Sequence, residues 1–96
     1  MKYQLKFKLD NIPGVGTMEM IAGQCETLKA SDAGLRLENI LQKRIGVRNY
    51  KNLSSATIVD VNGKDCAILR NESYYDPYFK CTYYKPQWGQ WLNIYD

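Results

Sequence analysis

The chain has 96 residues, a formal net charge of +3 and ordinary shares of hydrophobic (45%) and charged (24%) residues. This length suits one domain, no run of about 18 apolar residues could span a membrane, and no apolar leader marks a signal peptide. Histidine is absent, which removes the commonest general base and the commonest metal ligand. We therefore expect a single domain over residues 1–96 that is not an enzyme and holds no cofactor or metal.

The cysteines point to a reducing compartment. Cys25, Cys66 and Cys81 are an odd number, their spacing is long and irregular, and no CxxC pair occurs. Cysteines without a disulfide framework or zinc-ligand spacing are typical of cytosolic proteins. We expect three reduced thiols, mostly buried, in a cytoplasmic protein.

The first third of the chain predicts a β-hairpin. Over residues 2–9 apolar and polar side chains alternate, with Tyr3, Leu5, Phe7 and Leu9 on one face. A period of two indicates a half-buried strand. Turn-forming residues follow at 10–16, a second alternating segment covers 17–23, and a connection leads to residue 30.

The next segment predicts the only clear helix. Ser31 has the chemistry of an N-cap, and Gly46 follows the last periodic residue, as is typical of a helix C-terminus. Gly34 is unfavourable inside a helix, so we expect either that it marks a place of close packing or that the helix starts nearer Leu35. The apolar stripe that predicts the helix consists of Ala33, Leu37, Ile40, Leu41 and Ile45.

The second half predicts further strands. Asn62-Gly63 is a strong signal for a hairpin turn and separates two apolar segments. The expected segments are a strand at 56–61, its partner at 64–70, a loop at 71–77, a strand at 78–85, a turn at 86–89 and a last strand at 90–95.

Together these elements predict an α+β fold with two layers. We expect a mostly antiparallel sheet of five to six strands packed against one α-helix, in the order ββαββββ. One helix covers only one face of such a sheet, so an open face or edge strand makes a homodimer conceivable. The expected core consists of Leu5, Phe7, Leu37, Ile40, Leu41, Ile45, Ile58 and Ile68.

Positive charge is concentrated around the end of the predicted helix. No acidic residue lies between Asn39 and Val59, whereas Lys43, Arg44, Arg48 and Lys51 all do. Lys43 and Arg44 also suit the negative end of the helix dipole, so part of this cluster has a purely structural interpretation. The alternative interpretation is a basic patch that contacts a partner.

Aromatic residues are concentrated in the last third of the chain, where nine of the twelve lie from Tyr74 onward. Tyr74 and Tyr75 precede Asp76-Pro77 and are expected on a loop, Trp88 is expected in a turn, and Tyr84 lies on the strand between them. Exposed Tyr and Trp are typical of protein interfaces. Alternatively, the rings stabilise the sheet as cross-strand pairs or form part of the core.

These features favour a protein-binding module that has no enzymatic activity. The alternative is a small nucleic-acid-binding domain that stacks bases on aromatic rings beside basic residues, although the βαββαβ order of the RRM is absent. The residues expected to contact a partner are Lys43, Arg44, Arg48, Lys51, Tyr74, Tyr75, Tyr84 and Trp88.

Two segments resemble a family of small phage-encoded anti-CRISPR proteins that inhibit type I-F systems. They are Ser55-Ala56-Thr57-Ile58-Val59-Asp60-Val61-Asn62-Gly63 and Trp88-Gly89-Gln90-Trp91-Leu92. That family has a helix ahead of a hairpin and a tryptophan in its last strand, and it blocks target-DNA binding by contacting crRNA-backbone subunits of the surveillance complex. The resemblance implies an inhibitor of a host defence complex whose partner is a Cas protein.

Overall fold

The structure, a computed structural model that describes residues 1–94, contains five strands, one α-helix and one short 3-10 helix. In chain order these are β1 (Lys2–Ile12), β2 (Gly16–Glu26), α1 (Ala30–Ile45), the 3-10 helix η1 (Val47–Asn52), β3 (Leu53–Val59), β4 (Asp65–Asp76) and β5 (Cys81–Asn93). Tyr95, which the sequence predicts as the end of the last strand, lies outside the described residues.

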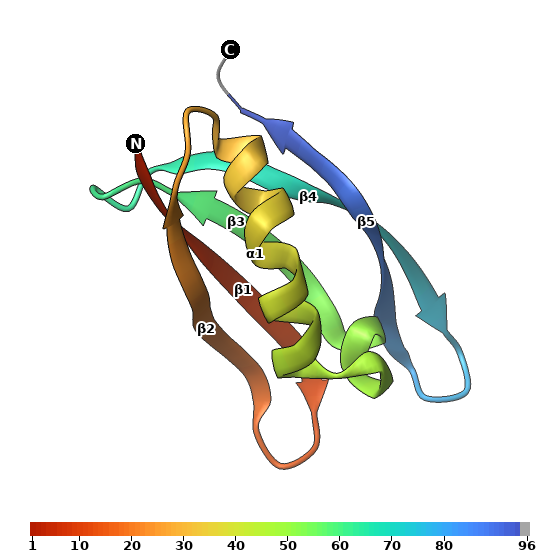
Figure 1. Ribbon diagram of the computed structural model, residues 1–96. Helices are drawn as coiled ribbons and strands as arrows, with labels where there is room; N and C mark the ends of the chain where they lie inside the picture. The colour runs from red at the N-terminus through yellow and green to blue at the C-terminus, as the bar shows by residue number, and fades with distance from the viewer. Residues whose placement is uncertain (95–96) are drawn as a thin grey trace.

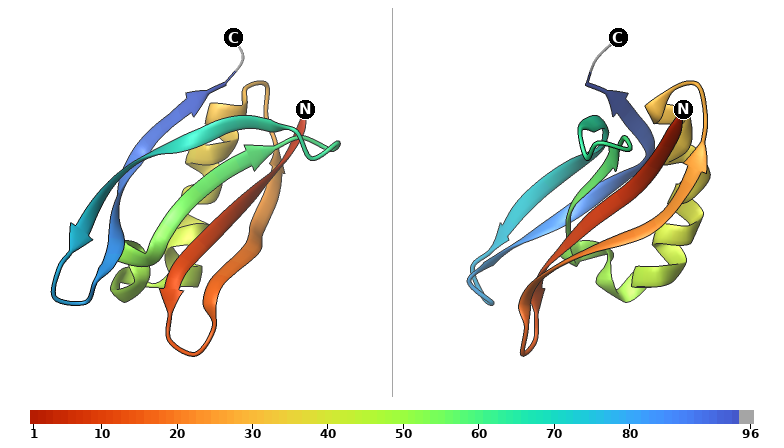
Figure 2. Two further views of the ribbon diagram at one scale, coloured as in Figure 1. Left: turned by 180° about the vertical axis from the view of Figure 1, so that it is seen from behind. Right: turned by 90° about the vertical axis from the view of Figure 1, so that its left-hand side faces the viewer.

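The strands form one antiparallel sheet in the order β2-β1-β3-β4-β5. α1 packs against one face and contacts both β2 and β5, so the sheet curves around the helix (Figures 1 and 2). The predicted two-layer α+β fold is confirmed. We call the face opposite α1 the open face, because no helix of the described chain covers it.

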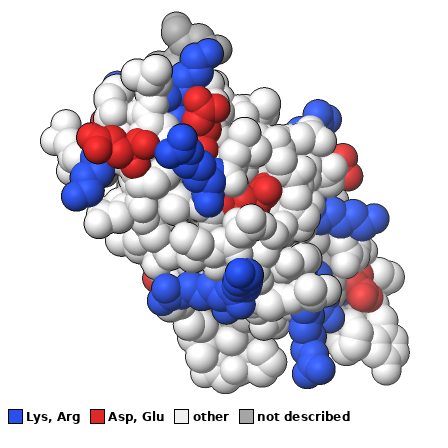
Figure 3. Space-filling model, viewed as in Figure 1, with Lys and Arg blue, Asp and Glu red and all other residues white. Residues whose placement is uncertain are grey.

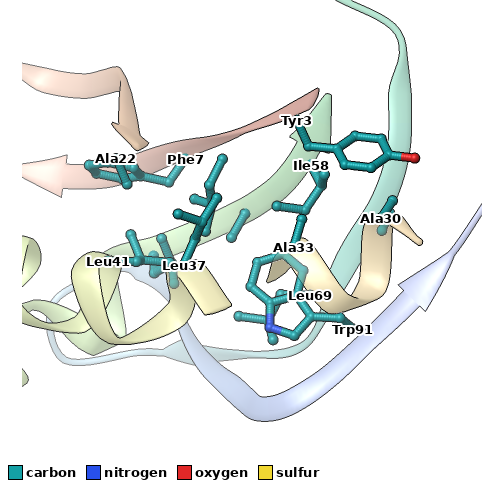
Figure 4. Close-up of a cluster of buried hydrophobic side chains, with 14 of the residues drawn as sticks. Tyr3, Phe7, Ala22, Ala30, Ala33, Leu37, Leu41, Ile58, Leu69 and Trp91 are labelled. Carbon is teal, nitrogen blue, oxygen red and sulfur yellow. The ribbon is translucent and has the colours of Figure 1, made fainter. Parts of the chain in front are cut away.

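The core forms between the inner face of the sheet and the apolar stripe of α1 (Figure 4). In β1 the alternation predicted from the sequence buries Tyr3, Leu5, Phe7 and Leu9. In α1 residues four positions apart lie on one side of a helix, and Ala33, Leu37, Leu41 and Ile45 are buried. Gly46 ends the helix with a positive φ of 79°, as predicted.

A tight seam joins α1 to β5. A Cβ atom at Gly34 would overlap the Trp91 indole, lying 2.6 Å from its Cγ and Cε3 atoms. Figure 4 shows this indole beside Ala33 and Leu69. Close packing is therefore why a glycine occupies the helix interior, as the sequence suggested.

Glu38 adds a polar contact to the same seam. Its Oε1 atom accepts hydrogen bonds from the backbone N–H of Gly89 (2.6 Å) and the ring N–H of Trp91 (3.2 Å).

The predicted end of the chain needs correction. Residues 71–76 of the predicted loop are instead the end of β4, and the chain reverses at residues 77–80. Residues 86–89 do not form a reversing turn either, so residues 81–85 and 90–93, predicted to belong to separate strands, are parts of one long strand, β5. Leu69 pairs with Trp91 and Asn71 with Pro86, which makes the turn-like residues a bulge in β5. Gly89 permits this bulge with a φ of 83°.

Smaller corrections concern element ends and two core residues. α1 begins at Ala30 and its N-cap position is Lys29, without a side-chain cap, so Ser31 is not the N-cap. Ile40 and Ile68 were expected in the core but are 46% and 42% exposed. Ile40 lies at the margin of the helix stripe, and Ile68 lies between two inward-facing residues of β4, which places it on the open face.

The seam between α1 and β5 gives the first prediction. Gly34→Ala should lower the free energy of unfolding by about 1–3 kcal/mol, because the new methyl group overlaps a rigid, buried indole. This loss should outweigh the gain of ~1 kcal/mol in helix propensity. Urea unfolding measures the difference. Asn39→Ala, on the exposed side of the same helix, is the control and should change stability by less than about 0.5 kcal/mol. Equal stability of both variants would contradict the described seam.

Candidate partner-binding site

The end of β4 and the turn that follows it carry a group of exposed rings. We call residues 74–83 the aromatic hairpin. Asp76 organises its turn, since Oδ1 accepts hydrogen bonds from the backbone N–H groups of Tyr78 (2.8 Å) and Phe79 (3.3 Å). The rings of Tyr78 and Phe79 then pack edge to face at 4.8 Å. The exposed fractions are 40% for Tyr74, 62% for Tyr75, 84% for Tyr78 and 62% for Phe79.

Two lysines flank a tyrosine pair on this hairpin. Tyr74 and Tyr83 are cross-strand partners whose ring centroids lie 6.0 Å apart. Lys51 Nζ lies 5.0 Å from the Tyr83 centroid, and Lys85 Nζ lies 5.3 Å from that of Tyr74. Both distances are within the range of cation–π attraction. Side chains from η1, β4 and β5 thus form one continuous group in the order Lys51, Tyr83, Tyr74 and Lys85, which we call the lysine–tyrosine ladder.

Tyr83 of the ladder and the neighbouring Tyr84 are neutral at physiological pH. A hydrogen bond with the Cys81 side chain, then desolvation and nearby negative charge, raises the pKa of Tyr83 to about 12. Burial and a hydrogen bond to Asp10 also raise the pKa of Tyr84. Because the Tyr83 phenol is neutral, its contact with Lys51 is a cation–π contact and not an ion pair.

Contacts at the base of the hairpin tie it to the first strand pair. The Tyr84 hydroxyl donates to Asp10 Oδ2 (3.0 Å), and Asn11 Nδ2 donates to the carbonyl oxygen of Thr82 (2.7 Å). The turn after β1 and the turn after β4 consequently lie at the same end of the molecule (Figure 1). Tyr84, expected to contact a partner, has this structural contact and is only partly exposed.

The basic segment, Lys43, Arg44, Arg48 and Lys51, runs from the last turn of α1 through η1. All four side chains belong to exposed residues. In the view of Figure 3, blue side chains are spread over the lower half of the molecule with few acidic neighbours. Lys51 connects this segment to the aromatic hairpin through Tyr83.

Trp88 lies where the sequence did not place it. It belongs to the bulge of β5 rather than to a turn, and it is half-buried against the core. Its ring packs edge to face on Tyr50 of η1, with centroids 5.0 Å apart. Trp88 therefore supports the position of η1, and with it the position of Lys51.

The structure thus brings together Lys51 and Tyr74, with Tyr75 next to Tyr74 at the end of β4. Beside them lie Tyr78, Phe79, Tyr83 and Lys85, which were not among the residues expected from the sequence to contact a partner. A chain reversal at residues 77–80 could have been predicted from Asp76-Pro77, which is typical of a turn. That prediction would have paired Tyr74 with Tyr83.

Other chemical groups are sparse in the described part of the chain. The three cysteines are free, but each is only partly buried and not buried as expected, because Cys25 and Cys66 pack at the margin of the core and Cys81 is the first residue of β5. Desolvation still raises the pKa of the Cys25 and Cys66 thiols, which makes them weaker nucleophiles at neutral pH. Within residues 1–94 no group of three or more His, Cys, Asp or Glu residues could hold a metal ion. The same residues include no helix long and apolar enough to cross a membrane.

Comparison with known proteins assigns no family. No family model matches the chain, and neither a curated protein nor a solved structure matches it at a significant level.

The different environments of the aromatic residues give a prediction about stability. Trp88→Ala should lower the free energy of unfolding by about 2 kcal/mol, less than the ~3–5 kcal/mol of a fully buried Trp. Tyr75→Ala should change it by less than about 0.5 kcal/mol, because that ring is largely exposed. Thermal and urea unfolding monitored by circular dichroism measure both. A Trp88 variant as stable as the wild type would show that its ring does not support η1.

Proposed function

We propose that this chain is a non-enzymatic protein-binding module that docks through the aromatic hairpin and the neighbouring basic segment. The observation that carries the proposal is the exposure of four large rings on the aromatic hairpin, from 40% for Tyr74 to 84% for Tyr78. The core is complete without them. Large rigid rings give much contact area at a low cost in conformational entropy, which is why they dominate protein interfaces.

The charge around the rings indicates the chemistry of the partner. Lys51 and Lys85 lie directly over Tyr83 and Tyr74, and Arg48 belongs to the same short helix as Lys51. A partner surface that presents carboxylates around an apolar pocket complements this arrangement. Such complementarity speeds association more than it strengthens the final complex.

The resemblance to type I-F anti-CRISPR proteins makes the proposal more specific. We propose that the partner is a protein of a host defence complex, with the crRNA-backbone subunits of a surveillance complex as the first candidate. In support, α1 precedes the β3–β4 hairpin and Trp91 lies in the last strand, the order that the resemblance implies. The two resembling segments lie in β3, in the turn after it and in β5. They include neither the aromatic hairpin nor the basic segment, so the partner contacts proposed here are made by other residues.

Binding of single-stranded nucleic acid is the second candidate function. The lysine–tyrosine ladder favours it, because bases stack on exposed rings and phosphates attract the adjacent ammonium groups. The two functions differ in their response to salt. Affinity for nucleic acid should fall steeply between 50 and 200 mM salt, whereas an interface dominated by rings should weaken only slightly.

The aromatic hairpin is tested by removing single rings. Tyr75→Ala and Tyr78→Ala should each weaken binding to a purified type I-F surveillance complex by about 1–3 kcal/mol, because each removes a large contact surface. Surface plasmon resonance measures the affinities. Leu28→Ala is the control, since this side chain is 90% exposed and lies outside the hairpin. Binding that survives both tyrosine substitutions would contradict the proposed site, and a wild-type protein without affinity would exclude this partner.

The basic segment is tested by charge reversal. The double variant Arg48→Glu and Lys51→Glu should slow association at least about ten-fold at low salt, because it replaces attraction by repulsion. The melting temperature should hardly change, since both residues are exposed. The same variant titrated with a fluorescent single-stranded oligonucleotide covers the second candidate function. Unchanged association rates would remove the basic segment from the interface.

A further inference from the structure

The open face carries a row of side chains that crosses all five strands. Cross-strand pairing aligns Ile21 with Lys6, Lys6 with Thr57, Thr57 with Ile68 and Ile68 with Leu92. Directly paired residues point to the same side of a sheet, so these five side chains share the open face. Three of them are large and aliphatic, with exposed fractions of 50% for Ile21, 42% for Ile68 and 51% for Leu92.

A polar, mainly basic row borders the aliphatic one. Lys8 pairs with Glu19 on one side and with Ser55 on the other, and Arg70 follows Ile68 on the same face of β4. Glu19 is engaged by Lys6, whose Nζ lies 3.7 Å from Oε1. Lys8 and Arg70 are both exposed, so positive charge is available next to the aliphatic side chains.

The two rows meet at a hollow between β3 and β4. These strands pair over only three residue pairs, from Thr57–Ile68 to Val59–Asp65, and then diverge (Figure 2). The divergence leaves a depression of about 360 Å³. It is lined by residues 54–57 of β3, residues 68–71 of β4 and Leu92. Its lining combines aliphatic side chains with the Arg70 side chain.

We propose that the open face is a second docking surface, and that its occupant is a protein segment with aliphatic side chains flanked by carboxylates. Aliphatic groups would enter the hollow beside Ile68 and Leu92, and carboxylates would pair with Lys8 and Arg70. A second copy of this chain fits less well, since stacking two open faces would bring like charges together. Nucleic acid also fits less well, because this row offers no aromatic ring on which a base could stack.

A displayed library of random 16-residue peptides tests the proposal without a known partner. The library is first depleted on immobilised Leu92→Gln protein and then selected on the wild type, so that surviving peptides require Leu92. Enriched peptides should combine aliphatic residues with net negative charge. Arg70→Gln should weaken their binding at least about five-fold, because it removes one charge from the rim of the hollow.

Matched controls lie on the helix. Leu35 is 49% exposed, close to the value for Leu92, and Arg36 is exposed like Arg70, so Leu35→Gln and Arg36→Gln should bind the peptides as the wild type does. Failure to enrich any peptide, or peptides without carboxylates, would overturn the proposal. So would a homodimer in analytical ultracentrifugation that Leu92→Gln dissociates, because the occupant would then be a second copy. None of the substituted residues belongs to the aromatic hairpin, so either result leaves the proposed function standing.

Discussion

The close approach of α1 to β5 is the constraint on which the rest of the structure depends. Because Gly34 has no side chain, the Trp91 indole reaches the helix backbone and is buried there. Glu38, about one helical turn further on, holds both the indole N–H and the backbone of Gly89. β5 also contains Tyr83 of the aromatic hairpin, on the N-terminal side of Gly89. The seam that anchors β5 to the helix therefore also fixes the position of the aromatic hairpin.

The bulge in β5 separates a buried part of the β4–β5 pair from a projecting one. On one side of the bulge, toward the C-terminal end of β5, Leu69 and Trp91 face the core as a cross-strand pair. Beyond it, the side chain of Asn71 donates to the carbonyl oxygens of Leu53 (2.8 Å) and Ser54 (3.2 Å), where β3 and β4 no longer pair. The projecting part is therefore attached to the sheet at its base. A pre-ordered hairpin loses less conformational entropy when it binds a partner than a mobile loop would.

Local patterns were sufficient to predict the elements whose signal lies within the element itself. The alternation of β1 and the stripe of α1 each follow from a single period, and the turn at Asn62-Gly63 follows from local backbone preferences. The end of the chain could not be predicted in this way, because Pro86 and Gly89 suit a reversing turn and a bulge equally well. The choice between them depends on the fit of Trp91 to Gly34, a contact between distant segments.

The same distinction separates the predictable and unpredictable parts of the candidate site. The exposure of Tyr74 and Tyr75 could be expected from the turn chemistry beside them, and that of Lys51 from its charge. The meeting of Lys51 with Tyr83 could not, because it requires η1 to pack against β5 through Tyr50 and Trp88. The aromatic residues of the last third therefore have two roles. Trp88 and Trp91 fix the strand and the 3-10 helix, which allows the rings of the hairpin to remain exposed at no cost to the core.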